Sequence, residues 1–319
     1  MKTRIHNAVL ALGLVLAVLM PGTAPSPTMQ PPVLAQAQAR APAAAANEAT
    51  PPVEEDSVRL AIIGDSGTGT RSQFEVGAQM ARARQRFPFE FVIMLGDNIY
   101  GSERPQDFAQ KFEKPYEPLL TAKVPFYASL GNHDDPTQRY YKPFNMDGER
   151  FYAFTKGNAR FFALDSNYMD QAQLKWLETE LSRSNDRWKV AYFHHPLYSS
   201  GGRHGSETDL RALVEPLFIK YGVDVVFAGH EHFYERIKPQ KGIYYFIAGG
   251  SAKLRRGDLR RGPLTAAGLD TDYTFMLAEL GKDVMRFQAL TRAGRLVDTG
   301  ALPLQPEPKR QDDAQSRAR

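Results

Sequence analysis

Five short apolar runs, each ending at a polar turn that usually contains glycine, constrain this chain of 319 residues more than any other feature. The runs and the turns that follow them read LAIIGD, FVIMLGD, FYASLGNH, VAYFHH and VVFAGHEH. Apolar runs of this length, bounded by turn residues, are typical of buried strands. We therefore predict five buried strands whose ends bring polar side chains to one site.

Amphipathic segments alternate with these runs, which indicates α/β layers. We predict helices over residues 72–86, 106–120, 170–184 and 209–221. From residue 243 onward the pattern changes to apolar runs separated by short loops, namely IYYFIAGG, FMLAEL, VMRFQAL and RLVDTGAL. These runs predict a second sheet, largely antiparallel, that packs on the first.

The two ends of the chain differ in composition from its middle. Residues 1–24 combine two basic residues, an apolar stretch and Pro-Gly-Thr-Ala, which is the layout of a secretory signal peptide. The apolar stretch is short for a membrane span, so we expect an exported protein (periplasmic or secreted) with no stable span, and an uncleaved N-terminal anchor as the alternative. We further predict a Pro/Ala-rich disordered linker over 25–56, one catalytic domain over 57–302 and a disordered tail over 303–319.

Composition restricts the class of partner. Formal net charge is +4, and removing Lys2 and Arg4 from the 40 basic residues leaves 38 against 36 acidic ones. Such a balance creates no global field for nucleic acid, so we expect a small substrate and no nucleic-acid partner. Oligomeric state is not indicated. The chain has no cysteine, which excludes disulfides, thiolate metal ligands and a cysteine nucleophile.

The polar residues at the strand ends are of the types that bind metal ions. They supply carboxylate, phenol, amide and imidazole groups, which suit iron, manganese or zinc. In chain order they are Asp65, Asp97, Tyr100, Asn132, His133, His194, His230 and His232. Such a set exceeds the three or four protein ligands usual for one ion. Two ions that share a bridging carboxylate would account for it, and paired ions can hold a hydroxide and neutralise charge during phosphate-ester hydrolysis.

The ordered blocks GDSG, GDNIY, GNHD, FHHP and GHEH resemble those of the calcineurin-like metallophosphoesterases, over about Arg59 to Gly250. Most of that superfamily begins with Asp-x-His, whereas Gly67 stands at the histidine position here. The purple acid phosphatase branch instead has a tyrosine three residues after its bridging aspartate, as Tyr100 follows Asp97. The histidine ligand is missing and the tyrosine ligand is present in the same chain, so the purple acid phosphatase branch fits best.

The resemblance implies an α/β fold, specifically a two-sheet αββα sandwich, and a binuclear-metal hydrolase of phosphate monoesters. In that family a metal-bound hydroxide attacks phosphorus. The resemblance also implies two sets of ligands. Iron(III) would be held by Asp65, Asp97, Tyr100 and His232. Zinc, iron(II) or manganese would be held by Asp97, Asn132, His194 and His230, with Asp97 bridging the two ions.

Two further histidines receive catalytic roles from the resemblance. His133 would contact the phosphate or protonate the leaving group. His204 lies near a substrate-facing histidine of the purple branch, although its spacing differs by one residue. For His195 a supporting or packing role is the better interpretation. Asp134 either orients a ring or caps the Asp-Asp-Pro turn. Iron(III) in the first site would favour an acidic pH optimum, because a trivalent ion lowers the pKa of bound water further than a divalent one.

Three alternatives to a monoesterase follow from the same residues. A phosphodiesterase or nucleotidase could use the same two-metal core. A metal-containing binding protein without catalysis is a second alternative, although all seven ligand positions are filled. The third is a serine protease, because Gly64-Asp65-Ser66-Gly67 resembles its nucleophile loop. In such proteases the catalytic histidine and aspartate precede the serine. The only histidine before Ser66 is His6 in the signal region, which excludes a serine protease of this type.

Overall fold

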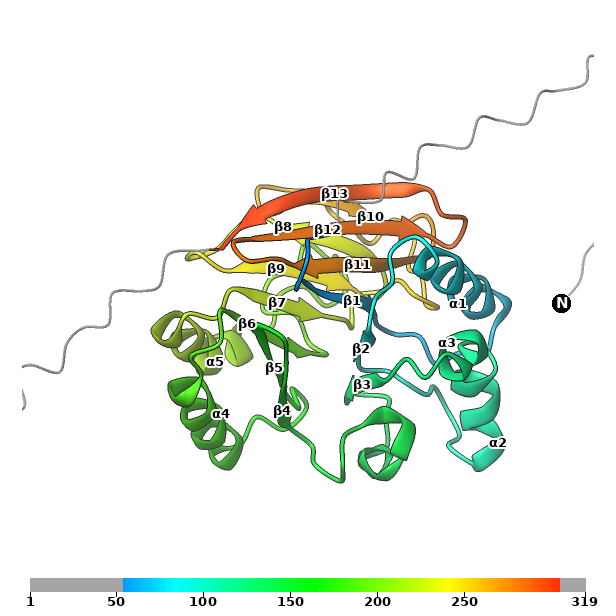
Figure 1. Ribbon diagram of the computed structural model, residues 1–319, viewed down its shortest axis with the longest axis horizontal. Coiled ribbons are helices and arrows are strands. Elements are labelled where there is room, and N and C mark those ends of the chain that lie inside the picture. Colours follow the sequence, from blue (N-terminus) through cyan, green and yellow to red (C-terminus); the bar gives the residue numbers. More distant parts are fainter. Residues whose placement is uncertain (1–53, 305–319) are drawn as a thin grey trace, which may run out of the picture. The chain divides into compact units, whose positions relative to one another are not determined.

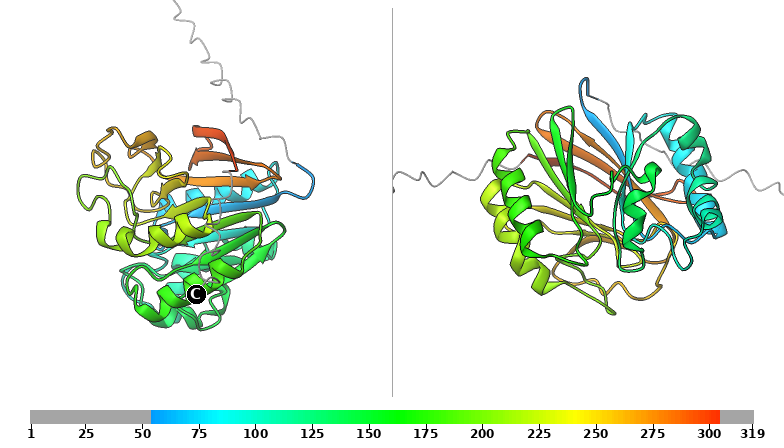
Figure 2. Two further views of the ribbon diagram at one scale, coloured as in Figure 1. Left: turned by 90° about the vertical axis from the view of Figure 1, so that its left-hand side faces the viewer. Right: turned by 90° about the horizontal axis from the view of Figure 1, so that it is seen from below.

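A computed structural model describes residues 54–304 of the chain as two β-sheets packed face to face, with helices on their outer faces (Figure 1). The second view in Figure 2 shows the helices on both outer sides of the paired sheets. The predicted αββα sandwich is therefore confirmed. The predicted signal peptide, nearly all of the linker and the tail from residue 305 lie outside the described residues.

The first sheet has six strands in the order β13-β12-β11-β1-β2-β3. Its three N-terminal strands are parallel, and β11 to β13 continue the sheet antiparallel from the other edge of β1. The strands are β1 (Val58–Ile63), β2 (Phe91–Leu95), β3 (Phe126–Ser129), β11 (Thr274–Leu280), β12 (Val284–Thr291) and β13 (Leu296–Pro303).

The second sheet has seven strands in the order β10-β8-β9-β7-β6-β5-β4. Strands β5, β6, β7 and β9 are parallel, and the outer strands pair antiparallel. The strands are β4 (Tyr152–Lys156), β5 (Ala159–Ala163), β6 (Trp188–Phe193), β7 (Val225–Ala228), β8 (Tyr234–Ile237), β9 (Tyr244–Ala248) and β10 (Thr265–Leu269).

Both faces of the central strands are buried, which explains why their sequences are continuously apolar. In β1, Leu60 and Ile62 face the other sheet, whereas Ala61 and Ile63 face the helices over the first sheet. These helices include α1 (Arg71–Arg84) and α3 (Glu117–Thr121). The outer face of the second sheet is covered by α4 (Gln171–Arg183) and α5 (Thr208–Tyr221).

The prediction of a separate C-terminal sheet is wrong. Strand β9 joins the parallel strands of the second sheet, and β11 to β13 belong to the sheet of β1. Leu60 of β1 pairs with Ala278 of β11 on one side and with Phe91 of β2 on the other. The apolar pattern of a strand identifies its buried faces, but it does not identify its neighbours.

Three of the predicted helices are confirmed with shifts of one or two residues, whereas the helix predicted over 106–120 is wrong. That segment forms α2 (Pro105–Phe108), a π-helical turn (Ala109–Glu113) and α3. Pro115 cannot donate a backbone hydrogen bond, and its ring prevents a regular turn, so the helix stops and restarts. Short 3-10 helices follow β3 at Pro136–Tyr140 and Lys142–Phe144.

Within residues 54–304, no helix combines the length and apolar character needed to cross a membrane.

Candidate metal centre

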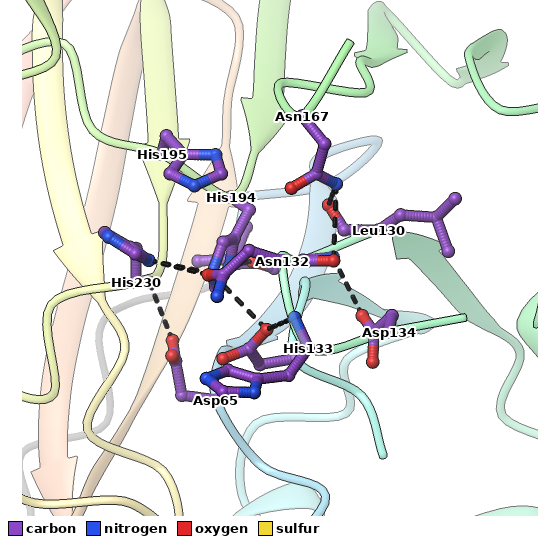
Figure 3. Close-up of polar contacts among 12 residues, drawn as sticks. Asp65, Leu130, Asn132, His133, Asp134, Asn167, His194, His195 and His230 are labelled. Atoms are coloured by element: carbon purple, nitrogen blue, oxygen red, sulfur yellow. Dashed lines mark hydrogen bonds and ion pairs between the residues drawn. The ribbon is translucent and has the colours of Figure 1, made fainter. Parts of the chain in front are cut away.

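The ends of β1, β2, β3, β6 and β7 bring their polar loops together at one edge of the sandwich (Figure 3). Within each sheet these strands are parallel, so their carboxyl ends lie on one side, where ligands gather in α/β proteins. Three loops come from the first sheet and two from the second. The site therefore lies where the two sheets meet.

A first group of ligand atoms is formed by Asp65, Tyr100 and His232. The Tyr100 hydroxyl donates to Asp65 Oδ1 at 3.1 Å and lies 3.4 Å from His232 Nε2. His232 Nε2 is 3.3 Å from the same Asp65 oxygen. Three potential ligand atoms from three loops thus converge on one point.

A second group is formed by Asn132, His194 and His230. Asn132 Oδ1 lies 2.9 Å from His194 Nε2 and 3.0 Å from His230 Nδ1. The two imidazole nitrogens are 3.1 Å apart. The contact between Asn132 and His230 is drawn in Figure 3.

Asp97 lies between the two groups. Its Oδ1 is 3.5 Å from His194 Nε2, and its carboxylate also accepts a hydrogen bond from Tyr100. The backbone N–H of His133 donates to Asp97 Oδ1 at 3.0 Å. The structure thus brings the seven predicted ligand residues close to one another, with Asp97 between the two groups.

The chemistry of these atoms fits bound cations. His194 Nδ1 contacts the Leu95 carbonyl at 2.9 Å and must donate to it, so a neutral His194 directs the lone pair of Nε2 at Asn132 Oδ1. Asp65 and Asp97 are 0% and 1% exposed, and no Lys or Arg within residues 54–304 forms an ion pair with either. Buried carboxylates without a Lys or Arg partner lack a fixed positive charge, which metal ions would supply.

The protonation equilibria of these groups agree with this interpretation. Burial, with the neighbouring His194 and His195, lowers the pKa of His230 to about 2, and burial with Arg255 lowers that of His232 to about 4. Burial also raises the pKa of Asp65 well above its ordinary value. Burial opposes ionisation of Asp97, yet His194 and the hydrogen bond from Tyr100 outweigh it and lower that pKa. His230 and His232 are therefore neutral at ordinary pH, as metal ligands must be.

Burial and the carboxylates of Asp65 and Asp97 raise the pKa of Tyr100 far above that of a free tyrosine. The phenol therefore keeps its proton in the protein alone. A cation beside its oxygen would reverse this balance, because a nearby positive charge favours the phenolate.

Close approach of the loops depends on glycine at two of the turns. A Cβ at Gly131 would lie 2.2 Å from the backbone nitrogen of Asp97, and one at Gly96 would lie 2.7 Å from His194 Nδ1. Gly96 also has a φ of +84°, which a side chain would strain. Any larger residue would push ligand loops apart.

Asp134 neither orients a ring nor caps the Asp-Asp-Pro turn, which are the two roles predicted for it. Its buried carboxylate accepts the backbone N–H groups of Gly131, Asn98 and Ile99 at 2.8, 2.8 and 3.1 Å. The adjacent Asp135, not Asp134, caps the turn by accepting from Thr137. Asp134 therefore joins the loops after β2 and β3, a role that depends on tertiary contacts and leaves no local sequence signal.

The predicted catalytic histidines lie around the ligand groups. The ring of His133 is 5.1 Å from that of Tyr100, and the ring of His204 is 4.4 Å from that of His230. Both side chains are exposed. The loop that carries His204 is tied to the metal-ligand turn, because the Gly205 N–H donates to Glu231 Oε1 at 2.7 Å.

His195 lies closer to the ligands than a packing role requires. Its Nδ1 is 2.8 Å from the Ser166 hydroxyl, and its ring is 4.5 Å from that of His230. Ser166 follows β5, which is not among the five strands that we predicted to end at the site. The preceding Asp165 has a structural role, because it is buried and paired with Arg150 at 2.7 Å.

Of the basic segment over residues 253–261, Lys253 reaches the ligands. Its Nζ lies 4.3 Å from the centre of the Tyr100 ring. Arg255 instead contacts Asp258 at 3.3 Å. Lys253 is thus a cation beside the first ligand group without an acidic partner of its own among the ion pairs of residues 54–304, whereas Arg255, whose charge also acts on His232, is paired with Asp258.

A two-sheet α/β sandwich with oxygen and nitrogen ligands at its strand ends is the arrangement expected of a metal-dependent hydrolase. The model of the calcineurin-like phosphoesterase family matches residues 58–234, more than half of the chain. The chain therefore belongs to the calcineurin-like phosphoesterase family, and it is a metal-dependent phosphoric ester hydrolase.

Known relatives confirm the resemblance to the purple branch. The chain is 26% identical over 247 residues to Purple acid phosphatase 17 of Arabidopsis thaliana, a match that covers 66% of this chain and 72% of that protein. It is 30% identical over 220 residues to Fe(3+)-Zn(2+) purple acid phosphatase 12 of the same plant, covering 59% of this chain and 45% of that protein. The chain thus spans less than half the length of the second relative.

A solved structure confirms the fold independently of sequence. The structure entitled "GAP50 the anchor in the inner membrane complex of Plasmodium" superposes with a TM-score of 0.68 at 19% identity. The match covers 82% of this chain and 92% of that one. At this identity, the likeness concerns the fold alone.

Proposed function

We propose that this protein is an acid phosphatase that hydrolyses small phosphate monoesters with two metal ions. The observation that carries the proposal is the convergence of seven oxygen and nitrogen ligands into two groups joined by Asp97. Family membership and purple acid phosphatase relatives support the same class. When bound, paired cations lower the pKa of water and neutralise the charge that develops on the phosphate.

We assign the ligands of each ion as the resemblance implies. Asp65, Tyr100 and His232 would hold iron(III), and Asn132, His194 and His230 would hold zinc, iron(II) or manganese. Asp97 would bridge them. The buried Asp65–Asp97–His194 group supports metal binding at this place, and the name of the iron–zinc relative supports this pair of metals.

Residues outside the ligand groups would handle the substrate. His133 and His204 are exposed on either side of the ligand atoms, where an imidazole could donate to a phosphate oxygen or to the leaving alcohol. Lys253, beside Tyr100, would attract the phosphate, and a cation here favours a dianionic monoester over a monoanionic diester.

One purified sample of the full chain tests this function. We expect two metals per chain, with iron giving visible colour, and faster hydrolysis of an aryl phosphate monoester than of the matching diester, with an acidic optimum. Asn132→Ala should lose the second metal and activity. Asn158→Ala, whose amide contacts the Gly281 carbonyl instead, should keep both.

The other outcomes identify the alternatives. Faster hydrolysis of the diester would indicate a phosphodiesterase. A protein that holds two metals but hydrolyses no phosphate ester would be a binding protein.

We also propose that the protein is exported. The support is the pattern of a basic start, an apolar stretch and small residues within residues 1–24. Expression of the full chain followed by fractionation and N-terminal sequencing would separate a cleaved signal from a retained anchor. Recovery of the full chain in the cytosol would contradict export.

A further inference from the structure

A cavity of about 370 Å³ opens beside the second ligand group, and its wall includes Asn132 and His195. Its volume is that of a site for a small organic molecule. We propose that this cavity binds the leaving alcohol of the substrate and selects one that is polyhydroxylated and carries no negative charge. This inference rests on the proposed phosphatase function and specifies its substrate class.

Hydrogen-bonding groups line the cavity next to the ligands. The Asn167 Nδ2 group is held by the Gly131 carbonyl at 3.2 Å and by Asp165 Oδ1 at 3.1 Å. Its Oδ1 accepts no hydrogen bond within residues 54–304, and in Figure 3 it points to the side on which His195 lies. Ser166 and His195 form a polar pair at 2.8 Å on the same wall. A hydroxyl-rich alcohol would meet both acceptors and donors here.

The charge of the lining opposes an anionic alcohol. No Lys or Arg of the described chain lines the cavity, whereas three carboxylates do. Asp165 is neutralised by Arg150, and Asp134 is occupied by backbone N–H groups. Glu207, by contrast, accepts no side-chain hydrogen bond and forms no ion pair within residues 54–304. Its charge would attract hydroxyl donors and repel a second anionic group.

An aromatic ring completes the cavity. Tyr168 lies on its wall and is 61% exposed, an unusual state for a large ring. Aromatic faces pack well on the apolar faces of sugar rings and on nucleobases. Uncharged polyhydroxy alcohols with such faces include monosaccharides and nucleosides.

A matched pair of substrates tests the charge selection. Glucitol 6-phosphate and 6-phosphogluconate are both open-chain and present the same phosphate, but the second has a carboxylate where the first has a hydroxymethyl group on the leaving alcohol. We expect kcat/KM to favour glucitol 6-phosphate. Glu207→Gln should raise kcat/KM for 6-phosphogluconate relative to glucitol 6-phosphate by about threefold to tenfold, which is the effect of one screened charge pair. An unchanged ratio would overturn the charge selection.

A second set of variants tests the ring. Tyr168→Ala should lower kcat/KM for glucose 6-phosphate or 5′-AMP by about threefold to tenfold, and Tyr168→Phe should restore it. A larger loss with glucose 6-phosphate identifies a sugar as the alcohol, and a larger loss with 5′-AMP identifies a nucleoside. Tyr140→Ala is the matched control, since Tyr140 is 63% exposed and does not line the cavity. Equal losses in the Tyr168→Ala and Tyr140→Ala variants would overturn the inference.

The two proposals fail in different ways. If the wild-type protein with both metals hydrolyses no p-nitrophenyl phosphate, the proposed function is wrong. If it hydrolyses that ester while the Glu207 and Tyr168 variants behave like wild type, the inference about the cavity alone is wrong.

Discussion

Asp65 and Asp97 show why this site needs cations. Both carboxylates are buried, and their charged or ionisable neighbours are imidazoles and a phenol rather than Lys or Arg. A buried carboxylate without a compensating charge costs several kcal/mol. The two carboxylates proposed to bind metal would therefore destabilise the protein when no metal is bound.

Tyr100→Phe tests the phenol as an iron ligand. The variant keeps the ring under Lys253 but loses the hydroxyl that contacts Asp65 and His232. We expect visible absorption to disappear and iron content to fall, because phenolate coordination produces the colour. Spectra and metal analysis of matched preparations check this, and an unchanged spectrum would refute the assignment.

Gly131→Ala tests the close approach of two ligand loops. Its Cβ would lie 2.2 Å from Asp97 N and 2.3 Å from Asp97 Oδ1, so the loops must separate. We expect a loss of about 1–3 kcal/mol in unfolding free energy together with weaker metal binding. Gly262→Ala is the control, since the nearest atom to its Cβ is 3.8 Å away. Equal stability of the two variants in urea denaturation would contradict the packing argument.

Buried polar contacts between elements hold the loops of the site in place. Glu215 of α5 joins three elements of the second half of the chain, because it accepts from Tyr198 at 2.7 Å, from Tyr245 of β9 at 3.1 Å and from Lys241 at 2.8 Å. Tyr198 lies in the segment that leads to His204. Glu215 therefore connects α5 and β9 to the segment that leads to the loop beside the ligand groups.

Glu215→Gln tests the pH dependence of this connection. Burial opposes ionisation of Glu215, but the three donors outweigh burial and lower its pKa below the ordinary 4.5. A lowered carboxyl pKa stabilises the folded protein above 4.5, and this stabilisation is lost as pH falls through the lowered value.

We expect Glu215→Gln to cost about 1–3 kcal/mol at neutral pH and progressively less below pH 4.5. Urea denaturation of wild type and variant across pH measures the difference. Glu117→Gln, on the exposed side of α3, is the control. A difference that does not change with pH would show that the charge of Glu215 is not what stabilises the connection.

The whole molecule is organised around the meeting of its two sheets at the ligand groups. Asp65, Asp97 and Asn132 follow strands of the first sheet, whereas His194, His230 and His232 follow strands of the second. Bound metals would therefore connect the sheets at this edge, in addition to the apolar core between them.

Metal removal should lower the stability of the whole sandwich. Saturating metal at about a thousand times its dissociation constant contributes about 4 kcal/mol, which corresponds to roughly 8–16 °C in Tm. We expect a chelator to lower Tm by such an amount and added metal to restore it, as measured by calorimetry. In His194→Ala the chelator should have a much smaller effect. A wild-type Tm insensitive to chelator would contradict a connecting role for metal.

Local sequence was enough to predict much of this molecule. The apolar runs predicted the central strands and the turns that carry the ligands, because burial on both faces demands continuous apolar residues. The order of the blocks, with Gly67 and Tyr100, identified the family and branch. Helix boundaries were predicted within one or two residues, except where Pro115 divides the segment that follows Tyr100.

Strand partners, and the roles of residues that contact distant segments, depended on the tertiary structure and could not be predicted from the sequence. The pairing of β11 with β1 joins strands far apart in the chain, and β9 pairs with β7 although β8 comes between them in sequence. Apolar patterns do not encode such strand partners. Asp134 and Ser166 acquired their roles in the same way, through groups that fold next to them. Ligand identity is a property of single residues and their turns, whereas sheet membership and the cavity beside Asn132 arise from packing. Sequence therefore determined which groups form the centre, and the fold determined which further residues surround it.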